Sequence, residues 1–98
     1  MLQEHYPNRL CFLRKRRRTS QKRLAVLAGI KNRSLVSHYE RGRVDPNFES
    51  AWKFAYILDV TPADIFPRLV SRWQQEVEAA RSKLPRPLTA QEFHDPNS

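Results

Sequence analysis

Residues 20–42 constrain the fold of this chain more than any other segment, because they form the pattern of two short helices joined by a tight turn. The segment holds both glycines of the 98-residue sequence. Gly29 stands at the turn and Gly42 ends the second helix, and glycine suits the left-handed backbone conformation needed at such positions. Ser20 and Asn32 are the predicted N-caps, since short polar side chains satisfy backbone N–H groups at a helix start.

Helical patterns also flank this pair, and no strand pattern accompanies them. Asn8 is the expected N-cap of a first helix that ends in a basic run, and Asn47 caps a helix over residues 48–59. Thr61 and Pro62 suit the start of a short helix over residues 63–66, and an amphipathic helix is expected over residues 68–84. The predicted fold class is all-α: an arm over residues 1–8, a five-helix domain over 9–67, the additional C-terminal helix, and a disordered tail over 85–98, which has three prolines.

Helical spacing predicts which apolar side chains face inward. The first helix is expected to bury Leu10, Leu13 and Cys11, and the second to bury Leu24, Ala25, Leu27 and Ala28. The third is expected to bury Val36 and Tyr39, and the fourth Phe48, Ala51, Trp52, Ala55 and Leu58. The C-terminal helix carries Leu69, Val70, Trp73, Val77, Ala80 and Leu84 on one side.

Positive charge is concentrated around the helix pair. Residues 9–43 contain twelve Lys or Arg and one acid, Glu40, a net charge of +11, whereas the rest of the chain sums to −3. Such a localised field indicates an anionic partner. A membrane-surface helix would need an unbroken apolar face opposite the basic one, and Gly29 and Gly42 interrupt this segment. No apolar run approaches the ~20 residues that span a bilayer, so the sequence favours duplex nucleic acid over a membrane.

Catalytic and cofactor patterns are weak in this sequence. His5, His38 and His94 are far apart, and the sequence contains neither a Cys/His cluster for zinc nor a glycine-rich phosphate loop. Cys11 is the only cysteine, which excludes an internal disulfide and is typical of a reducing compartment. We therefore expect no enzyme activity, no metal, no cofactor and a cytoplasmic location.

Seven short motifs follow one another in a recognisable order. They are Leu13-Arg14, Ser20-Gln21, Leu24-Ala25, Ala28-Gly29-Ile30, and the residues of 36–42, 46–49 and 60–66. With these motifs, residues 10–66 resemble the Cro/C1-type helix-turn-helix domain of the XRE family. The interval from Gly29 to Glu40 is one residue longer than the common family spacing, and we place the extra residue in the turn at Ile30-Lys31. The resemblance implies a lambda-repressor-like fold.

The resemblance also implies a DNA interface, in which the second helix of the pair lies in the major groove and the first crosses the backbone. It places Gln21 near a phosphate. It assigns base reading to Arg33, Ser34 and His38, with Ser37 beside them. Arg33 can pair bidentately with guanine, although Arg33 and His38 could also be solvated surface residues. Leu35 could contact a thymine methyl group or flank the core.

Other charged residues receive separate roles. Arg41 and Arg43 follow the reading helix and are expected to hold phosphates. Arg17 belongs to a basic run that could be a phosphate clamp, a localisation signal or solvated charge, and we favour phosphate contact. The resemblance pairs Arg14 with Glu40 as a structural ion pair inside the domain.

The sequence therefore predicts a sequence-specific regulator of transcription, such as a repressor. It is expected to bind double-stranded DNA as a homodimer on a palindromic operator. The helix over residues 68–84 is the expected dimer contact, although Leu69 and Trp73 could instead pack on the domain's own core. One alternative is an antitoxin-type regulator that also binds a protein partner through the C-terminal helix. Another is a nucleic-acid-binding protein without sequence preference.

Overall fold

The computed structural model describes residues 7–84, and within that range the chain forms six helices and no strand. The helices are α1 (Leu10–Arg16), α2 (Gln21–Leu27), α3 (Arg33–Glu40), α4 (Phe48–Leu58), α5 (Pro62–Ile65) and α6 (Pro67–Arg81). The predicted all-α class, with five helices and an additional C-terminal one, is confirmed. Most of the predicted arm and the whole predicted tail lie outside the described residues.

Short polar residues start the helices at the predicted places. The side chains of Ser20, Asn32 and Asn47 accept hydrogen bonds from backbone N–H groups in the first turns of α2, α3 and α4. Thr61 and Asp64 form a reciprocal capping box on α5. Each such cap contributes about 1 kcal/mol, so these side chains fix where the short helices begin.

Several helix ends differ from the prediction: α4 ends at Leu58 rather than at residue 59, and α5 spans Pro62–Ile65 rather than residues 63–66. The differences at α1 and α6 say more about the fold. Arg9, rather than Asn8, directly precedes α1, but the Asn8 Oδ1 still accepts from the Leu10 N–H at 3.0 Å. The Asn8 Nδ2 also donates to the carbonyl oxygen of Tyr39 at 2.8 Å, so Asn8 joins the start of α1 to the end of α3 and belongs to the folded domain. At the other end, α6 includes Pro67 and stops at Arg81, three residues before the predicted end at residue 84.

Helices α1 to α5 enclose one apolar core. Phe54 lies at its centre and makes an edge-to-face contact with the ring of Tyr39, with centroids 5.8 Å apart. The other fully buried large side chains come from five different helices, and they are Leu10, Leu24, Val36, Leu58 and Ile65. Because each helix supplies one or two of these side chains, the packing holds the α2–α3 pair against α1 and α4.

Three apolar residues expected in the core are on the surface instead. Leu27, Phe48 and Trp52 are 54%, 60% and 52% exposed. In α4 the buried stripe comprises Ala51, Phe54, Ala55 and Leu58, so the prediction missed Phe54. The helix is turned slightly relative to the expected face, which leaves Phe48 and Trp52 on the side nearest α6.

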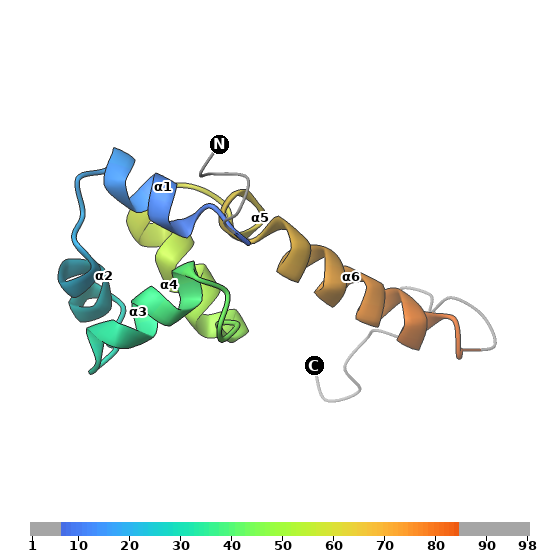
Figure 1. Ribbon diagram of the computed structural model, residues 1–98. Helices are drawn as coiled ribbons and strands as arrows, with labels where there is room; N and C mark the ends of the chain where they lie inside the picture. Colours follow the sequence, from blue (N-terminus) through green and yellow to red (C-terminus); the bar gives the residue numbers. More distant parts are fainter. Residues whose placement is uncertain (1–6, 85–98) are drawn as a thin grey trace, which may run out of the picture.

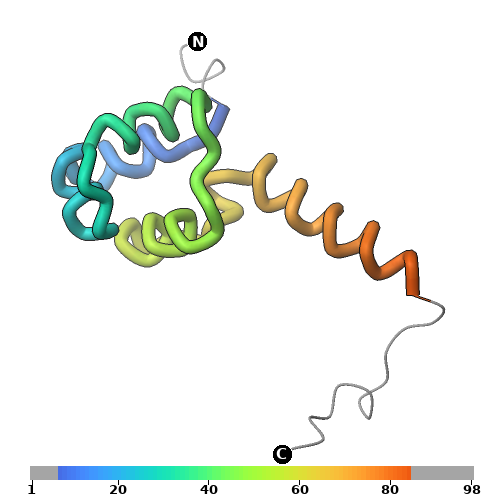
Figure 2. Tube along the Cα trace, turned by 90° about the horizontal axis from the view of Figure 1, so that it is seen from below, coloured from blue at the N-terminus to red at the C-terminus, as the bar shows by residue number. Residues whose placement is uncertain are grey.

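The α2–α3 pair and α6 lie at opposite ends of the molecule. Figures 1 and 2 show α2 and α3 at one end of the bundle, while α6 leaves α5 and extends away from the other helices. Leu69 is buried and Trp73 is partly buried against the core, so only the first part of α6 is anchored to the domain. The outer part of this helix projects from the bundle.

We expect Gly42→Ala to destabilise the domain more than Gly29→Ala. Both glycines have left-handed backbone angles, with φ of +71° and +74°, where an L-residue costs roughly 1–2 kcal/mol. A Cβ at Gly42 would also lie 2.5 Å from the Cγ of Pro7, whereas at Gly29 the nearest atom would be the Lys53 Nζ at 4.0 Å. Urea denaturation of both variants measures the difference. Equal losses would show that Pro7 moves aside without cost.

Candidate nucleic-acid interface

The turn between α2 and α3 is held by a backbone hydrogen bond and by apolar side chains that pack against the core. The N–H of Ile30 donates to the Ala25 carbonyl at 2.8 Å, which is the hydrogen bond expected after a left-handed glycine at a helix end. Ile30 and Leu35 are partly buried and pack against the core. Leu35 therefore flanks the core, one of the two roles that the sequence left open for it.

The side chains of α3 divide between the core and the solvent. Val36 and Tyr39 are buried, as predicted, whereas Arg33 and Ser34 are exposed in the first turn. Ser37 and His38 are partly buried. The N-terminal turn of α3 thus presents a guanidinium and a hydroxyl to the surroundings, which are donor groups able to contact base edges.

A shallow hollow beside this turn brings further cations near Arg33. Lys22 of α2 and Lys31 of the turn line the hollow together with Arg33. Both lysines are exposed. The sequence analysis did not place these two lysines in the site, because it treated them only as part of the positive charge of residues 9–43. Their common position with Arg33 comes from the folding of α2 against α3.

The structure brings Arg14 and Glu40 together inside the domain. The Arg14 Nε donates to the Glu40 Oε2 at 2.5 Å, and the Nη2 donates to the other carboxylate oxygen at 3.3 Å. The two side chains are only 10% and 5% exposed. The Arg14 Nη1 also donates to the Thr19 carbonyl at 3.0 Å. This two-point contact fixes the C-terminal end of α3 against α1.

The pKa of Arg14 is raised above its usual value. Burial by itself lowers this pKa, but the hydrogen bond to Glu40 and the attraction of its carboxylate together raise it by more. Cys11, half-buried rather than buried, adds a smaller effect in the same direction. Arg14 is therefore a permanent cation, and its charge is neutralised within the domain by Glu40.

Gln21, the first residue of α2, is bound to the same carboxylate. Its Nε2 donates to the Glu40 Oε1 at 3.0 Å, so Glu40 accepts from both α1 and α2. The amide group has a second N–H, which remains as a donor for the phosphate contact that the resemblance implies. Gln21 consequently links the orientation of α2 to that of α3.

The remaining predicted DNA contacts lie in different places. Arg41 and Arg43 are exposed just after α3, and their backbone N–H groups donate to the Ser37 and His38 carbonyls, which holds this segment to the helix. Arg17 lies beside the end of α4, where its Nη2 is 3.3 Å from the Asp59 Oδ2. The structure therefore does not bring Arg17 to α3, and Asp59 partly compensates its charge.

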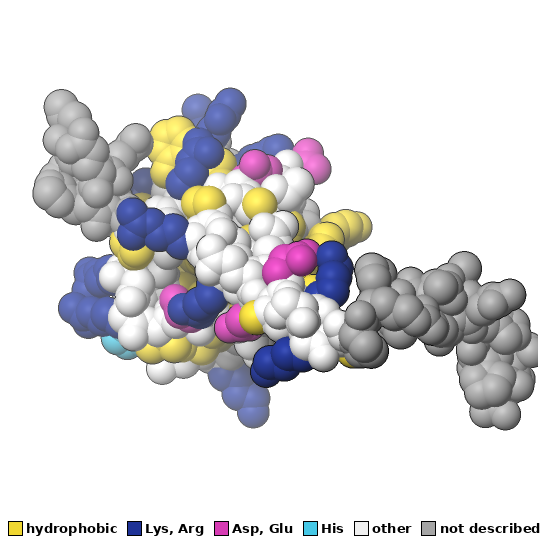
Figure 3. All heavy atoms as spheres, turned by 90° about the vertical axis from the view of Figure 1, so that its right-hand side faces the viewer, with side chains coloured by type: hydrophobic (Ala, Val, Ile, Leu, Met, Phe, Trp, Pro, Cys, Tyr) yellow, Lys and Arg dark blue, Asp and Glu magenta, His cyan; other side chains and the backbone are white. Residues whose placement is uncertain are grey.

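The exposed charge of the basic segment is entirely positive. Glu40 is the one acid in residues 9–43, and it is buried, so the surface of that segment carries only cations. Residues 44–84, by comparison, carry five Lys or Arg and six Asp or Glu. Figure 3 shows acidic and basic side chains interspersed on the face that carries α6. The helix pair is thus the electropositive part of the domain.

Two further features bear on the type of site. Within residues 7–84, no three or more His, Cys, Asp and Glu side chains are grouped so that they could hold a metal ion. In the same part of the chain, no helix has the length and apolar character required to cross a bilayer.

Comparison with known proteins identifies the family. A family model described as Helix-turn-helix, HTH_3, matches residues 12–65, which is more than half of the chain and extends from α1 to α5. No curated protein matches the chain. The match confirms the resemblance to the Cro/C1 type found from the motifs. With its α2–α3 pair and its electropositive surface, the chain belongs to the HTH_3 helix-turn-helix family and is a DNA-binding transcription regulator of the XRE type.

Proposed function

We propose that this regulator reads a specific DNA sequence through the exposed side of α3 and binds a palindromic operator as a homodimer. The observation that carries the proposal is the exposure of Arg33 and Ser34 in the first turn of α3, on a segment whose only acid is buried. A guanidinium and a hydroxyl in that position match the donor and acceptor groups that base pairs present in the major groove.

In this arrangement α3 lies in the major groove and α2 crosses the phosphate backbone. The Arg33 guanidinium donates to O6 and N7 of a guanine, which is a bidentate contact that a wrong base does not satisfy. Ser34, Ser37 and His38 contact the neighbouring base edges or sugars. Gln21 donates its second N–H to a phosphate at the start of α2.

The exposed cations supply affinity without sequence preference. Arg41, Arg43, Lys22 and Lys31 surround α3 and contact phosphates on its two sides, whereas Arg17 contributes less because Asp59 pairs with it. Occupying an operator that overlaps a promoter then represses transcription in the cytoplasm. Two units are needed, because one α3 reads only a few base pairs.

Selection of bound duplexes from a random pool tests sequence preference directly. We expect an enriched site with two inverted half-sites whose centres are about 10 base pairs apart, that is, one helical turn. The selected site should be bound at least ~10³-fold more tightly than random duplex. Weak binding that is steeply salt-dependent and has no preferred site would overturn the proposal in favour of a non-specific nucleic-acid-binding protein.

Arg41→Ala and Arg43→Ala should each weaken binding to all duplexes by a similar factor. Each change removes about one phosphate contact, so the slope of log Kobs against log salt should fall by about 1 per half-site. The preferred site should stay the same. Lys83→Ala, which removes a cation beyond the far end of α6, serves as the control and should leave the slope unchanged. A changed site preference in either arginine variant would reassign that arginine to base reading.

A further inference from the structure

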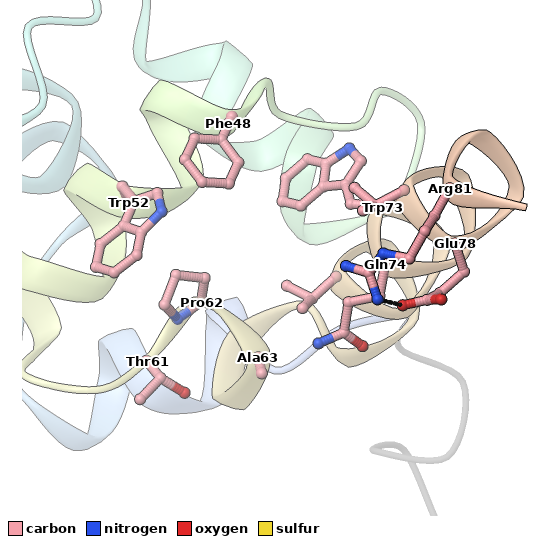
Figure 4. Close-up of a pocket in the computed structure, with 11 residues that line it drawn as sticks. Phe48, Trp52, Thr61, Pro62, Ala63, Trp73, Gln74, Glu78 and Arg81 are labelled. Atoms are coloured by element: carbon pink, nitrogen blue, oxygen red, sulfur yellow. Dashed lines mark hydrogen bonds and ion pairs between the residues drawn. The ribbon is translucent and has the colours of Figure 1, made fainter. Parts of the chain in front are cut away.

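An apolar groove lies between α6 and the α4–α5 corner of the domain. Figure 4 shows Phe48, Trp52, Pro62 and Trp73 around its opening. The Phe48 and Trp73 rings have centroids 5.3 Å apart, and Phe48 and Trp52 are 6.1 Å apart. Val77 continues the groove along α6 and is 55% exposed. Small soluble domains rarely expose a contiguous apolar patch of this kind. Such patches mark interaction sites.

The apolar residues of α6 follow the spacing of a coiled-coil seam. Within α6, intervals of three, four and three residues separate Val70, Trp73, Val77 and Ala80, and Phe66 and Leu84 continue the same spacing in the sequence just outside the helix. Such a repeat places one continuous stripe against a partner helix. The domain's own core buries only the first part: Phe66 is 3% exposed, whereas Leu84 is 45% exposed. Among the described residues, no helix packs on the outer half of the stripe.

We infer that the groove receives α6 of a second copy of this chain, and that the two α6 helices run parallel as a short coiled coil. The inference rests on the proposed function and specifies how its dimer forms. Each α6 covers the partner helix along Val70, Trp73 and Val77. Phe48 and Trp52, at the wall of the groove, cover the partner's helix from the side, and by the two-fold symmetry each copy makes the same contacts.

Charge complementarity identifies the partner as a second α6 and sets its direction. Glu76 and Arg81 flank the seam on opposite sides, at the positions that face each other across a parallel two-stranded coiled coil. Each dimer would therefore contain two Glu76–Arg81 ion pairs. Within one chain Arg81 contacts Glu78 at 2.8 Å, but both side chains are about 60% exposed, so Arg81 can change partner.

An antiparallel arrangement fits less well. It would pair Glu76 with Lys83, and it would place Trp73 opposite Leu84. Both Lys83 and Leu84 lie beyond Arg81, where α6 ends, so they do not continue the helical stripe. The parallel arrangement instead uses residues within the helix. It also holds the two DNA-binding domains at the same end of the coiled coil, as inverted half-sites one turn apart require.

The effect of Val77→Glu on the oligomeric state of the full chain tests the interface. Sedimentation equilibrium should show a dimer for the wild type and at least a 100-fold weaker dimer for the variant, because a carboxylate would be buried in the seam. Gln75→Glu is the matched control: it adds the same charge two residues away, outside the stripe, and should remain dimeric. Gln75→Glu should melt like the wild type, and Val77→Glu should match the wild type once both are diluted enough to be monomeric, since both positions are exposed in a single chain.

Exchanging the flanking charges tests the direction. Glu76→Arg and Arg81→Glu should each weaken the dimer by roughly tenfold, because each places like charges opposite one another twice per dimer. The double variant should restore wild-type affinity. A monomeric wild type, equal dimerisation of Val77→Glu and Gln75→Glu, or a double variant no better than the single ones would overturn the inference.

DNA titrations separate this inference from the proposed function. Val77→Glu should still bind a single half-site with wild-type affinity, while its advantage on the full palindrome is lost. A wild-type dimer that showed no preferred site would sink the proposed function and leave the interface intact. A wild type that dimerises and prefers a palindromic site, but whose dimerisation is not weakened by Val77→Glu, would overturn the interface and leave the proposed function intact.

Discussion

Glu40→Ala is expected to lower the free energy of unfolding by about 3–5 kcal/mol, because it leaves the buried guanidinium of Arg14 without its counterion. The same change removes the acceptor for Gln21, so α2 loses its link to α3. A loss of this size is a large fraction of the stability of a small domain. Urea denaturation monitored by circular dichroism measures it.

Two control variants separate the buried ion pair from charge in general. Glu49→Ala removes an acid that is 73% exposed and paired with Lys53 at 2.8 Å, and it should cost far less than Glu40→Ala because solvent screens this pair. Replacing both members, as Arg14→Met with Glu40→Leu, should recover much of the lost stability, since neither charge is then buried alone. If Glu40→Ala cost no more than Glu49→Ala, the pair would contribute little to folding.

Glu40→Ala should not change which DNA sequence is preferred. Glu40 is 4% exposed and is directed into the domain, so it cannot contact a base. At a temperature where the variant is still folded, the random-pool selection should return the wild-type site. Stability and specificity thus depend on different residues of the same helix.

Arg33→Ala is expected to abolish preference at one base pair of each half-site. A bidentate contact to guanine contributes about 1–3 kcal/mol of discrimination, so two half-sites together lose roughly 30-fold to 10⁴-fold in specificity. Selection from a random pool with this variant should show no preferred base at that position. The melting temperature should not change, because Arg33 is exposed and lies outside the core.

Two matched variants show whether the effect comes from reading rather than charge. Lys31→Ala removes a neighbouring cation that lines the same hollow, and it should weaken binding to all sequences without changing the preferred site. Arg33→Lys keeps the charge but loses the planar fork, so it should relax the preference almost as far as Arg33→Ala. An unchanged site for Arg33→Ala would place base recognition elsewhere on α3.

Local chemistry made most helix boundaries predictable. Ser20, Asn32, Asn47 and Thr61 determine helix starts through hydrogen bonds within a few residues, so their effect can be read from sequence. The buried face of α4 could not be determined in this way. Its apolar residues surround so much of the helix that two overlapping stripes fit the spacing, one with Phe48 and one with Phe54. Only the packing of the other helices selects between them.

The candidate site was predictable to a similar extent. The motifs indicated the residues of α3 and, through the family resemblance, the partnership of Arg14 with Glu40 across 26 positions of sequence. They could not show that Arg17 would meet Asp59, because that contact depends on where α4 ends. The motifs also could not show that Lys22 and Lys31 share a hollow with Arg33, since the relative rotation of α2 and α3 decides it.

The carboxylate of Glu40, which accepts from Arg14 and Gln21, has a consequence for the energetics of recognition. It ties the last residue of α3 to the first residue of α2 and to α1, so the tilt of the reading helix is set before DNA arrives. Little conformational entropy is then lost on association, and more of the contact free energy remains as affinity. The helix pair is therefore preorganised for binding. Because no rearrangement of the helices is needed, binding should proceed in one kinetic step.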